Sequence, residues 1–299
     1  MMFIIKYRKY FYIFSSVLIT ASIASILLFG FRLGIDFTGG SILEAEYKNG
    51  RPDISLIKEG IKEGGFDNAI VQPTGDNGVL VRLRELSEEE HQTLLDTPIF
   101  EGSEQLRFDS IGPIIGNELK KNSLTAIILV LVMILAFVTW SFRKVSKPVS
   151  SWKYGVVAIV ALTHDVLVPI GFFVVLGKFI NVEADTLFVT ALLTILGFSV
   201  HDTIVVFDRI RENIRRFGSS LQFEEVVGKS LSEVIGRSLA TSFALFIVLL
   251  LLYIFGESST SYFILTLLVG VIAGTYSSVF LASPLIVSWD NLSRARKRS

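Results

Sequence analysis

Cysteine is absent from the 299 residues of this chain. Its absence excludes disulfide bridges, cysteine-ligated zinc sites and thiol nucleophiles. The phosphate-binding pattern G-x-x-x-x-G-K-[ST] is also missing, so nucleotide hydrolysis is not expected. Histidine occurs three times, and no nucleophile–histidine–acid arrangement is apparent. We therefore expect a protein that is not an enzyme and that carries no cofactor and no metal.

An excess of charge of either sign is lacking as well. Lys and Arg together number 28, as do Asp and Glu. Charged residues make up only 19% of the chain, whereas 51% is hydrophobic and the mean hydropathy is +0.58. This apolar content is too high for an ordinary soluble domain and predicts a polytopic α-helical membrane protein.

Long apolar runs occur six times, each near the roughly 20 residues that a helix needs to cross a bilayer. The predicted spans are Tyr12–Phe31, Leu124–Phe142, Tyr154–Leu176, Asp185–Phe207, Val234–Phe255 and Tyr262–Trp289. The first run follows basic residues as a signal peptide does, but it is long and lacks a small-residue cleavage pattern. We therefore expect it to be retained as a membrane span.

Basic residues gather in alternate connections between these spans. They are Lys6, Arg8 and Lys9 at the N-terminus; Arg143, Lys144, Lys147 and Lys153; Arg209, Arg211, Arg215, Arg216, Lys229 and Arg237; and Arg294, Arg296, Lys297 and Arg298 at the C-terminus. Between the third and fourth spans stands only Lys178, and between the fifth and sixth no basic residue occurs. Because cytoplasmic loops carry the excess of Lys and Arg, both termini are predicted to be cytoplasmic. The polar region between the first two spans is then external.

The external region shows alternating strand and helix patterns. Strands are predicted at Ser41–Tyr47, Ala69–Gln72, Val79–Arg84 and Leu106–Ser110, and helices at Ile54–Glu63 and Ser87–Leu95. Ser87 and Glu90 have the spacing of a capping box. The order β-α-β-β-α-β predicts an α+β ferredoxin-like domain on the external, periplasmic side. His91 of this region is expected to be an ordinary surface residue.

Four parts of the chain are predicted from these patterns. They are a first transmembrane helix in residues 1–33, the external domain in 34–121, a five-helix bundle in 122–290 and a basic cytoplasmic tail in 291–299. The bundle includes a cytoplasmic loop at residues 208–233. This loop is either a solvated, positively charged connection or a docking surface for a cytoplasmic partner or anionic lipid headgroups.

Two His-Asp pairs stand inside predicted spans, His164 with Asp165 and His201 with Asp202. A charge at the centre of a bilayer costs on the order of 2.5–3.5 kcal/mol, so such groups usually face a partner or a polar pathway. At 1.5 Å rise per residue, the first pair lies about 15 Å from the cytoplasmic end of its span and the second roughly 8–12 Å. Arg237 stands near the cytoplasmic start of the fifth span. All five therefore fall in the inner half of the membrane, where neighbouring spans could bring them together.

The pattern predicts a proton relay of these five side chains. An arginine beside a carboxylate keeps the carboxylate charged, so a shift of one span could load and release a proton. Histidine titrates near physiological pH and is a suitable intermediate. The alternatives are that the His-Asp pairs only pack or hydrogen-bond, and that Arg237 reaches to the membrane surface.

Glycines mark two further features. The segment GIDFTGG, which includes Gly34, Asp36, Gly39 and Gly40, follows the first span. It is either a tight connection into the external sheet or a hinge between span and domain. In the sixth span, small residues recur at every fourth position, namely Gly270, Gly274, Ser278 and Ala282. This face predicts close helix packing, either within the chain or against a second subunit.

Three motifs resemble one known family. They are GIDFTGGSILE at Gly34–Glu44, LTHDV at Leu162–Val166 and GFSVHDTIVVFDRIREN at Gly197–Asn213. Together they resemble the SecF family of bacterial protein-export subunits, within the resistance-nodulation-division (RND) superfamily, and the likeness covers essentially the whole chain. The third motif is long and specific, whereas GIDFTGG alone is shared with the sister family SecD.

The resemblance implies a subunit of the bacterial inner membrane that pairs with a six-span SecD. It also implies association with the SecYEG channel, often with YajC, and use of the proton-motive force to move secretory polypeptides outward. Asp202, inside the third motif, and Arg237, matched by position, would take part in proton transport. The family's other key acid lies in SecD, so this chain would hold half of the relay.

Other functions stay open on the sequence. One is a small-molecule exporter of the same superfamily, which the small and polar external domain disfavours. Another is a structural scaffold that stabilises the channel without ion flow. Either a proton or sodium could be the coupling ion, and no nucleic-acid partner is expected.

Overall fold

The computed structural model describes residues 2–143, 149–218, 220–256 and 260–296. Four of the basic residues expected in the cytoplasm, Lys144, Lys147, Lys297 and Arg298, lie outside these ranges. The chain forms two compact units. One comprises Met1–Arg32 and Thr125–Ser299, and the other comprises Leu33–Leu124.

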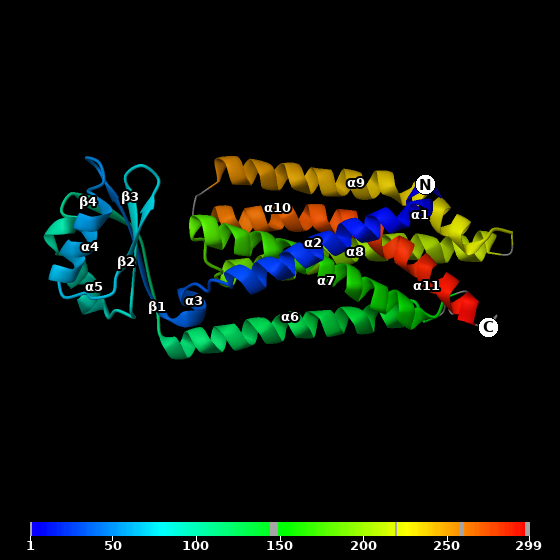
Figure 1. The fold of residues 1–299 in the computed structure, drawn as a ribbon, viewed down its shortest axis with the longest axis horizontal. Coiled ribbons are helices and arrows are strands. Elements are labelled where there is room, and N and C mark those ends of the chain that lie inside the picture. Colours follow the sequence, from blue (N-terminus) through cyan, green and yellow to red (C-terminus); the bar gives the residue numbers. More distant parts are fainter. Residues whose placement is uncertain (1, 144–148, 219, 257–259, 297–299) are drawn as a thin grey trace. The chain divides into compact units, whose positions relative to one another are not determined.

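The first unit is a bundle of helices (Figure 1). Its elements are α1 (Met2–Lys6), α2 (Arg8–Phe29), α6 (Pro113–Ser141, which begins in the other unit), α7 (Ser151–Ile180), α8 (Thr186–Phe217), α9 (Phe223–Phe255), α10 (Ser261–Tyr276), the π-helical segment η3 (Ser277–Ala282) and α11 (Ser283–Arg296). In the part of the chain that the structure describes, six helices are long and apolar enough to cross a membrane, the last being the continuous run α10–η3–α11. The predicted number of spans agrees with this count.

Several helices extend beyond their apolar stretches. The end of the predicted external domain 34–121 is helical from Pro113 onward, and the predicted cytoplasmic loop 208–233 consists mostly of the ends of α8 and α9. Helical hydrogen bonding does not require apolar side chains, so hydropathy marks the membrane-crossing part of a helix and not its ends. Side chains join the two polar ends, because Asn213 Nδ2 donates to Ser230 Oγ at 3.0 Å and Arg209 Nε lies 2.6 Å from Glu233 Oε2.

The helices of the bundle divide into a central and a peripheral set. In the most apolar stretch of α7 and of α8, 44% of the residues are buried, and in the last span 67% are. The corresponding shares are 11% for α2, 6% for α6 and 17% for α9. A large part of α7, α8 and the last span is therefore enclosed by protein, whereas α2, α6 and α9 present broad apolar surfaces, as expected of helices that face lipid or another apolar chain.

The small-residue face of the last span packs inside the chain. A Cβ atom placed on Gly270 would lie 2.2 Å from Ile195 Cδ1, and one on Gly274 would lie 3.0 Å from Ser199 Cβ. Glycine at these positions lets α10 approach α8 closely. Of the two interpretations of this face, internal packing is thus the one the structure shows at these two positions.

The second unit contains a four-stranded antiparallel sheet (Figure 1). Its elements are α3 (Ile35–Thr38), β1 (Gly40–Tyr47), α4 (Ile54–Glu63), β2 (Ile70–Thr74), β3 (Gly78–Leu83), α5 (Glu88–Leu95), the 3₁₀ turn η1 (Pro98–Phe100) and β4 (Ser103–Ile111). The strands lie in the order β2-β3-β1-β4, so the first and second strands along the chain flank the third, as in a split βαβ arrangement. The predicted element order is confirmed.

Local signals account for the start of α5. The Ser87 side chain accepts from the Glu90 backbone, and the Glu90 side chain accepts from the Ser87 backbone, which completes the predicted capping box. Hydrogen bonds from Arg84 and from the Ser87 backbone lower the pKa of Glu90 to about 2. The expectation that His91 is a surface residue is wrong. His91 is buried, stacks on Phe108 with ring centroids 3.6 Å apart, and has its Nε2 2.9 Å from Gln105 Oε1, because β4 packs across α5.

Candidate functional site

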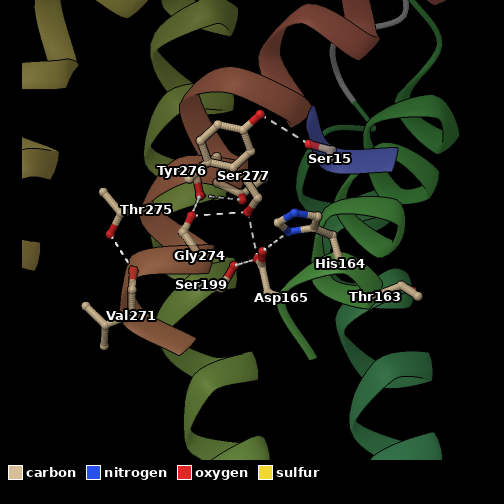
Figure 2. A network of polar contacts seen from close by, with 12 residues as sticks. Ser15, Thr163, His164, Asp165, Ser199, Val271, Gly274, Thr275, Tyr276 and Ser277 are labelled. Atoms are coloured by element: carbon tan, nitrogen blue, oxygen red, sulfur yellow. Dashed lines mark hydrogen bonds and ion pairs between the residues drawn. The ribbon is translucent and has the colours of Figure 1, made fainter. Parts of the chain in front are cut away.

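The first buried polar site lies on α7. His164 and Asp165 are both 0% exposed, and His164 Nδ1 lies 2.9 Å from Asp165 Oδ1 (Figure 2). An ionised carboxylate can only accept, so Nδ1 is the donor in this bond when Asp165 is charged. The imidazole is thereby oriented by its neighbour in the sequence, and its other nitrogen carries the lone pair.

Two serines complete the surroundings of Asp165. The hydroxyl of Ser199, on α8, donates to Asp165 Oδ2, and Ser277 Oγ, at the first residue of η3, lies 2.7 Å from the same oxygen. Ser277 Oγ also lies 3.1 Å from the backbone oxygen of Gly274. Burying a carboxylate is costly unless it is well hydrogen-bonded, and here three donors from three elements supply those bonds.

His164 has one nitrogen without a partner. Its Nε2 is buried and makes no hydrogen bond to any described residue. The Tyr276 ring lies against the imidazole, with centroids 5.9 Å apart, and the Tyr276 hydroxyl is engaged elsewhere, by Ser15 Oγ at 3.3 Å and Phe11 O at 3.0 Å. Figure 2 shows the tyrosine hydroxyl directed toward Ser15 and away from the imidazole.

The helix of the last span changes to π geometry at this site. Within η3, Ser278 Oγ lies 2.8 Å from Gly274 O and 3.1 Å from Thr203 Oγ1 of α8, and Ser283 Oγ donates to Ser278 O at 2.9 Å. All of these hydroxyls are buried. Single π-helical turns are rare and are frequently found at functional sites. The turn here brings Ser277 and Ser278 to separate partners on α7 and α8.

The second buried acid is Asp202 on α8, which is 3% exposed. Its Oδ2 accepts from Ser238 Oγ, on α9, at 2.6 Å. Arg237, the neighbour of that serine, is exposed and makes no ion pair within the part of the chain that the structure describes. His201 is exposed as well. The side chains of Arg237 and His201 therefore lie on the surface of this single chain.

The five predicted relay residues thus occupy two places. Hydrogen bonds join His164 to Asp165, but no hydrogen bond or ion pair between described residues joins this pair to Asp202, His201 or Arg237. The two places are connected through α8, because Ser199 contacts Asp165 and Asp202 contacts Ser238 one turn later.

Sequence reasoning missed Ser199, Ser238 and Ser277 as partners of the two acids. Serine is common in membrane helices, so these residues carry no distinctive pattern. The only local signal was the position of Ser277, which directly precedes Ser278 of the small-residue face.

The GIDFTGG segment is closely packed within the second unit. Gly39 and Gly40 have φ angles of +77° and +126°, which favour glycine. A Cβ atom on Gly39 would lie 2.8 Å from Pro113 Cα, and one on Gly116 would lie 2.9 Å from Gly39 N. Gly34 precedes α3 in extended conformation, and Asp36 lies in the first turn of that helix. These contacts describe a tight connection to the start of α6, and a hinge function stays a prediction.

Metal binding has no support in the geometry of either site. Among the residues the structure describes, no three His, Asp or Glu side chains converge as metal ligands would. Both sites offer hydrogen-bonding groups and titratable side chains.

Two known families match the sequence. Residues 94–292 match the family described as "Protein export membrane protein SecD/SecF, C-terminal", and residues 24–50 match the "SecD/SecF GG Motif". The second match contains the GIDFTGG segment, and the first contains both His-Asp pairs.

Characterised relatives cover nearly the whole chain. The protein translocase subunit SecF of Thermobaculum terrenum is 44% identical over 96% of this chain and 94% of its own length. That of Sebaldella termitidis is 40% identical over 95% of this chain and 90% of its own length. The SecDF subunit of Brucella abortus is 34% identical over 92% of this chain, which spans only 35% of that longer protein.

A solved structure has the same fold. The crystal structure of SecDF, a translocon-associated membrane protein from Thermus thermophilus, superposes with a TM-score of 0.81 at 31% identity. The match covers 96% of this chain and 38% of that one. A crystal structure of SecDF in a "super-membrane-facing" form superposes with a TM-score of 0.67 at 30% identity, over 98% of this chain and 39% of that one.

Proposed function

This chain belongs to the SecD/SecF family of protein-export membrane proteins, and from that premise we propose that it is an accessory subunit of the Sec protein translocase driven by the proton-motive force. Its relatives are named as translocase subunits, which supports a role in Sec-associated translocation. The coupling to protons rests on one observation. Asp202 is 3% exposed within a spanning helix, and its hydrogen-bond partner is a neutral serine.

A carboxylate in this position is costly while it is charged. A single hydroxyl compensates only part of the penalty of removing the charge from water, so protonation relieves the remainder. Arg237 stands next to Ser238 on α9, so a rotation of that helix by about 100° would exchange the serine for the guanidinium. We propose that Asp202 alternates between a protonated state bonded to Ser238 and a charged state paired with Arg237 or with a partner's cation.

His201 and Arg237 are exposed on this chain, which fits a relay completed by a second subunit. Relatives such as the SecDF of Brucella abortus, of which this chain spans about a third, carry a SecD part in the same polypeptide. SecD is therefore the proposed partner in the membrane. We further propose association with the SecYEG channel and YajC, and contact with secretory polypeptides as clients.

The proposed orientation follows from the basic connections. Both termini lie in the cytoplasm, the membrane is the bacterial inner membrane, and the second unit is a ferredoxin-like periplasmic domain. Movement of α9 and its neighbours on proton binding would then change the attachment of the periplasmic unit, which acts on the emerging polypeptide.

The test compares Asp202→Asn with Asp208→Asn in the complex reconstituted with SecD, SecYEG and the SecA motor in vesicles. Asp208 lies on the same helix, is exposed and pairs with Arg211, so it is a matched control. The expected result for Asp202→Asn is normal assembly with loss of the export that an imposed proton gradient adds. Asp208→Asn keeps that increment.

Two outcomes would replace the proposal. Full gradient-driven export by Asp202→Asn and by Arg237→Gln would indicate a scaffold without ion flow. Transport of a small apolar compound by the chain alone, stimulated by that compound, would indicate an exporter.

A further inference from the structure

The proposed relay uses Asp202 and assigns no role to the His164–Asp165 pair. This pair differs from a purely structural hydrogen bond in one respect. Its members are 0% exposed, yet His164 Nε2 has no hydrogen-bond partner among the described residues. A buried polar atom without a partner loses its interaction with water and receives nothing in return.

The charge of the pair explains why the atom is kept. With Nδ1 donating to the carboxylate, a neutral His164 leaves the buried pair with one net negative charge, which only neutral hydroxyls offset. A proton added to the Nε2 lone pair makes an imidazolium, and the pair becomes neutral overall. No other bond needs to break, since the Nδ1–Asp165 bond is retained and becomes an ion pair.

We propose that His164 Nε2 is a second proton-binding atom of this chain, which works separately from Asp202 and is complete without a partner subunit. Asp165 is its counter-charge. Ser199 and Ser277 are positioning residues, since they hold the carboxylate and through it the ring. The proposal deepens the proposed function, because a second proton site in the same bundle would be read by the same translocation machinery.

The surroundings support a separate site. From α10, Tyr276 lies against the imidazole, but its hydroxyl is bonded to Phe11 O and lies near Ser15 Oγ of α2. Tyr12 of α2 is bonded to Ser288 of α11, at 2.9 Å. The buried acids on helices packed against α7 have other partners, Asp202 with Ser238 and Asp290 with Arg294. The exposed acids of α8, Asp208 and Glu212, pair with Arg211 and Arg209.

The site is also hydrogen-bonded to the π-helical segment η3. Ser277, one of the donors to Asp165, is the first residue of the π-helical segment η3, which is bonded to α8 through Ser278 and Thr203. An imidazolium competes with Ser277 for the charge of the same carboxylate, so proton binding at His164 weakens the Ser277 bond. Proton binding at His164 therefore acts on the turn that joins α10 to α11.

The experiment uses the small number of histidines. The full chain, labelled with ¹⁵N only in histidine, carries three imidazoles, His91, His164 and His201. Each is assigned by its own His→Gln variant, in nanodiscs that also contain SecD. The ¹⁵N shifts distinguish the neutral Nδ1–H tautomer, the Nε2–H tautomer and the imidazolium, and they are followed from about pH 8.5 to about pH 5.5, across the ordinary titration of histidine.

We expect His164 to be the Nδ1–H tautomer when it is neutral and to gain the Nε2 proton on acidification. In Asp165→Asn it stays neutral throughout, because the counter-charge is lost, while in Asp202→Asn it titrates as in the wild type. A His164 signal that shows the Nε2–H tautomer, or that never changes, overturns the proposal even if Asp202→Asn abolishes gradient-driven export. A titrating His164 together with full export by Asp202→Asn keeps this proposal and removes the proposed function.

Discussion

The same dipeptide, His-Asp, occurs on α7 and on α8 in opposite surroundings. On α7 both members are 0% exposed, and the acid receives three hydrogen bonds from its own chain. On α8 the histidine is exposed, and the buried acid is bonded to one serine. A pair enclosed by one chain is complete, whereas a pair at the surface of one chain leaves room for a second. The two sites therefore differ in the number and origin of their hydrogen-bond partners, although the dipeptide is the same.

The largest expected effect comes from removing each acid in turn. Asp165→Leu leaves two buried donors unpaired, His164 Nδ1 and Ser199 Oγ, because Ser277 Oγ keeps Gly274 O as an acceptor. Each unpaired donor costs about 1–3 kcal/mol, so the free energy of unfolding falls by at least about 2 kcal/mol. Asp202→Leu leaves only the Ser238 hydroxyl unpaired, so its free energy of unfolding falls by about 1–3 kcal/mol. Thermal unfolding in detergent, monitored by size-exclusion chromatography, measures both. Equal losses would mean that the two sites are equally enclosed.

The next effect compares the stability cost of a methyl group added against the buried face of α8 with that of one added on its exposed face. Gly270→Ala places a Cβ atom 2.2 Å from Ile195 Cδ1, in a core where overpacking costs typically about 1–3 kcal/mol. Gly197→Ala, on α8 itself, meets no atom within 4 Å and serves as the control. The stability of the first variant should fall and that of the second should not. A destabilised Gly197→Ala variant would show that the exposed face of α8 around Gly197 packs closely against another helix.

A third effect concerns access to the two histidines. The chain lacks cysteine, so His201→Cys and His164→Cys each introduce a single thiol. Because thiol reactivity follows exposure, a membrane-permeable maleimide should label the first at a rate at least about tenfold higher. SecD should protect the His201→Cys thiol and leave the slow rate at position 164 unchanged. Rapid labelling at both positions would contradict the division into a closed and an open site.

The smallest effect lies outside the bundle and tests whether ordinary surface electrostatics behave as expected. The folded-state pKa of Glu90 is about 2, below its usual 4.5, because Arg84 and the Ser87 backbone donate to it. A lowered carboxyl pKa contributes stability that is complete above about pH 4.5 and is lost as the pH falls toward 2. Acid titration of the amide exchange of α5 should show this loss in the wild type and not in Glu90→Gln. An identical profile in both would assign the acid sensitivity of α5 to other groups.

Much of the fold was open to prediction, because it depends on local patterns. Apolar runs located the spans, and alternation and capping located the strands and α5, whose capping box formed as expected. The ends of α8 and α9 were not located, since a helix continues through polar sequence. His91 was misjudged for a related reason. Its burial depends on contacts with Phe108 and Gln105 of β4, which the sequence around His91 does not indicate.

The candidate site was predicted in its acids and histidines and not in its partners. An ionisable residue inside an apolar run is conspicuous, so Asp165 and Asp202 could be singled out from the sequence. Ser199, Ser238 and Ser277 became significant only when α8, α9 and η3 were packed together. The expected single cluster of five residues became two sites, because α8 presents Ser199 to α7 and Asp202 to α9.

The six spans, the one polar insertion and the titratable residues inside the spans can all be found from the order of the amino acids. These properties are sums over neighbouring residues, such as hydropathy and periodicity. Which His-Asp pair is enclosed, which hydroxyls bind each acid and where the last span becomes π-helical are known only from the folded chain. Those outcomes depend on contacts between residues distant in the chain, and burial is a property of those contacts.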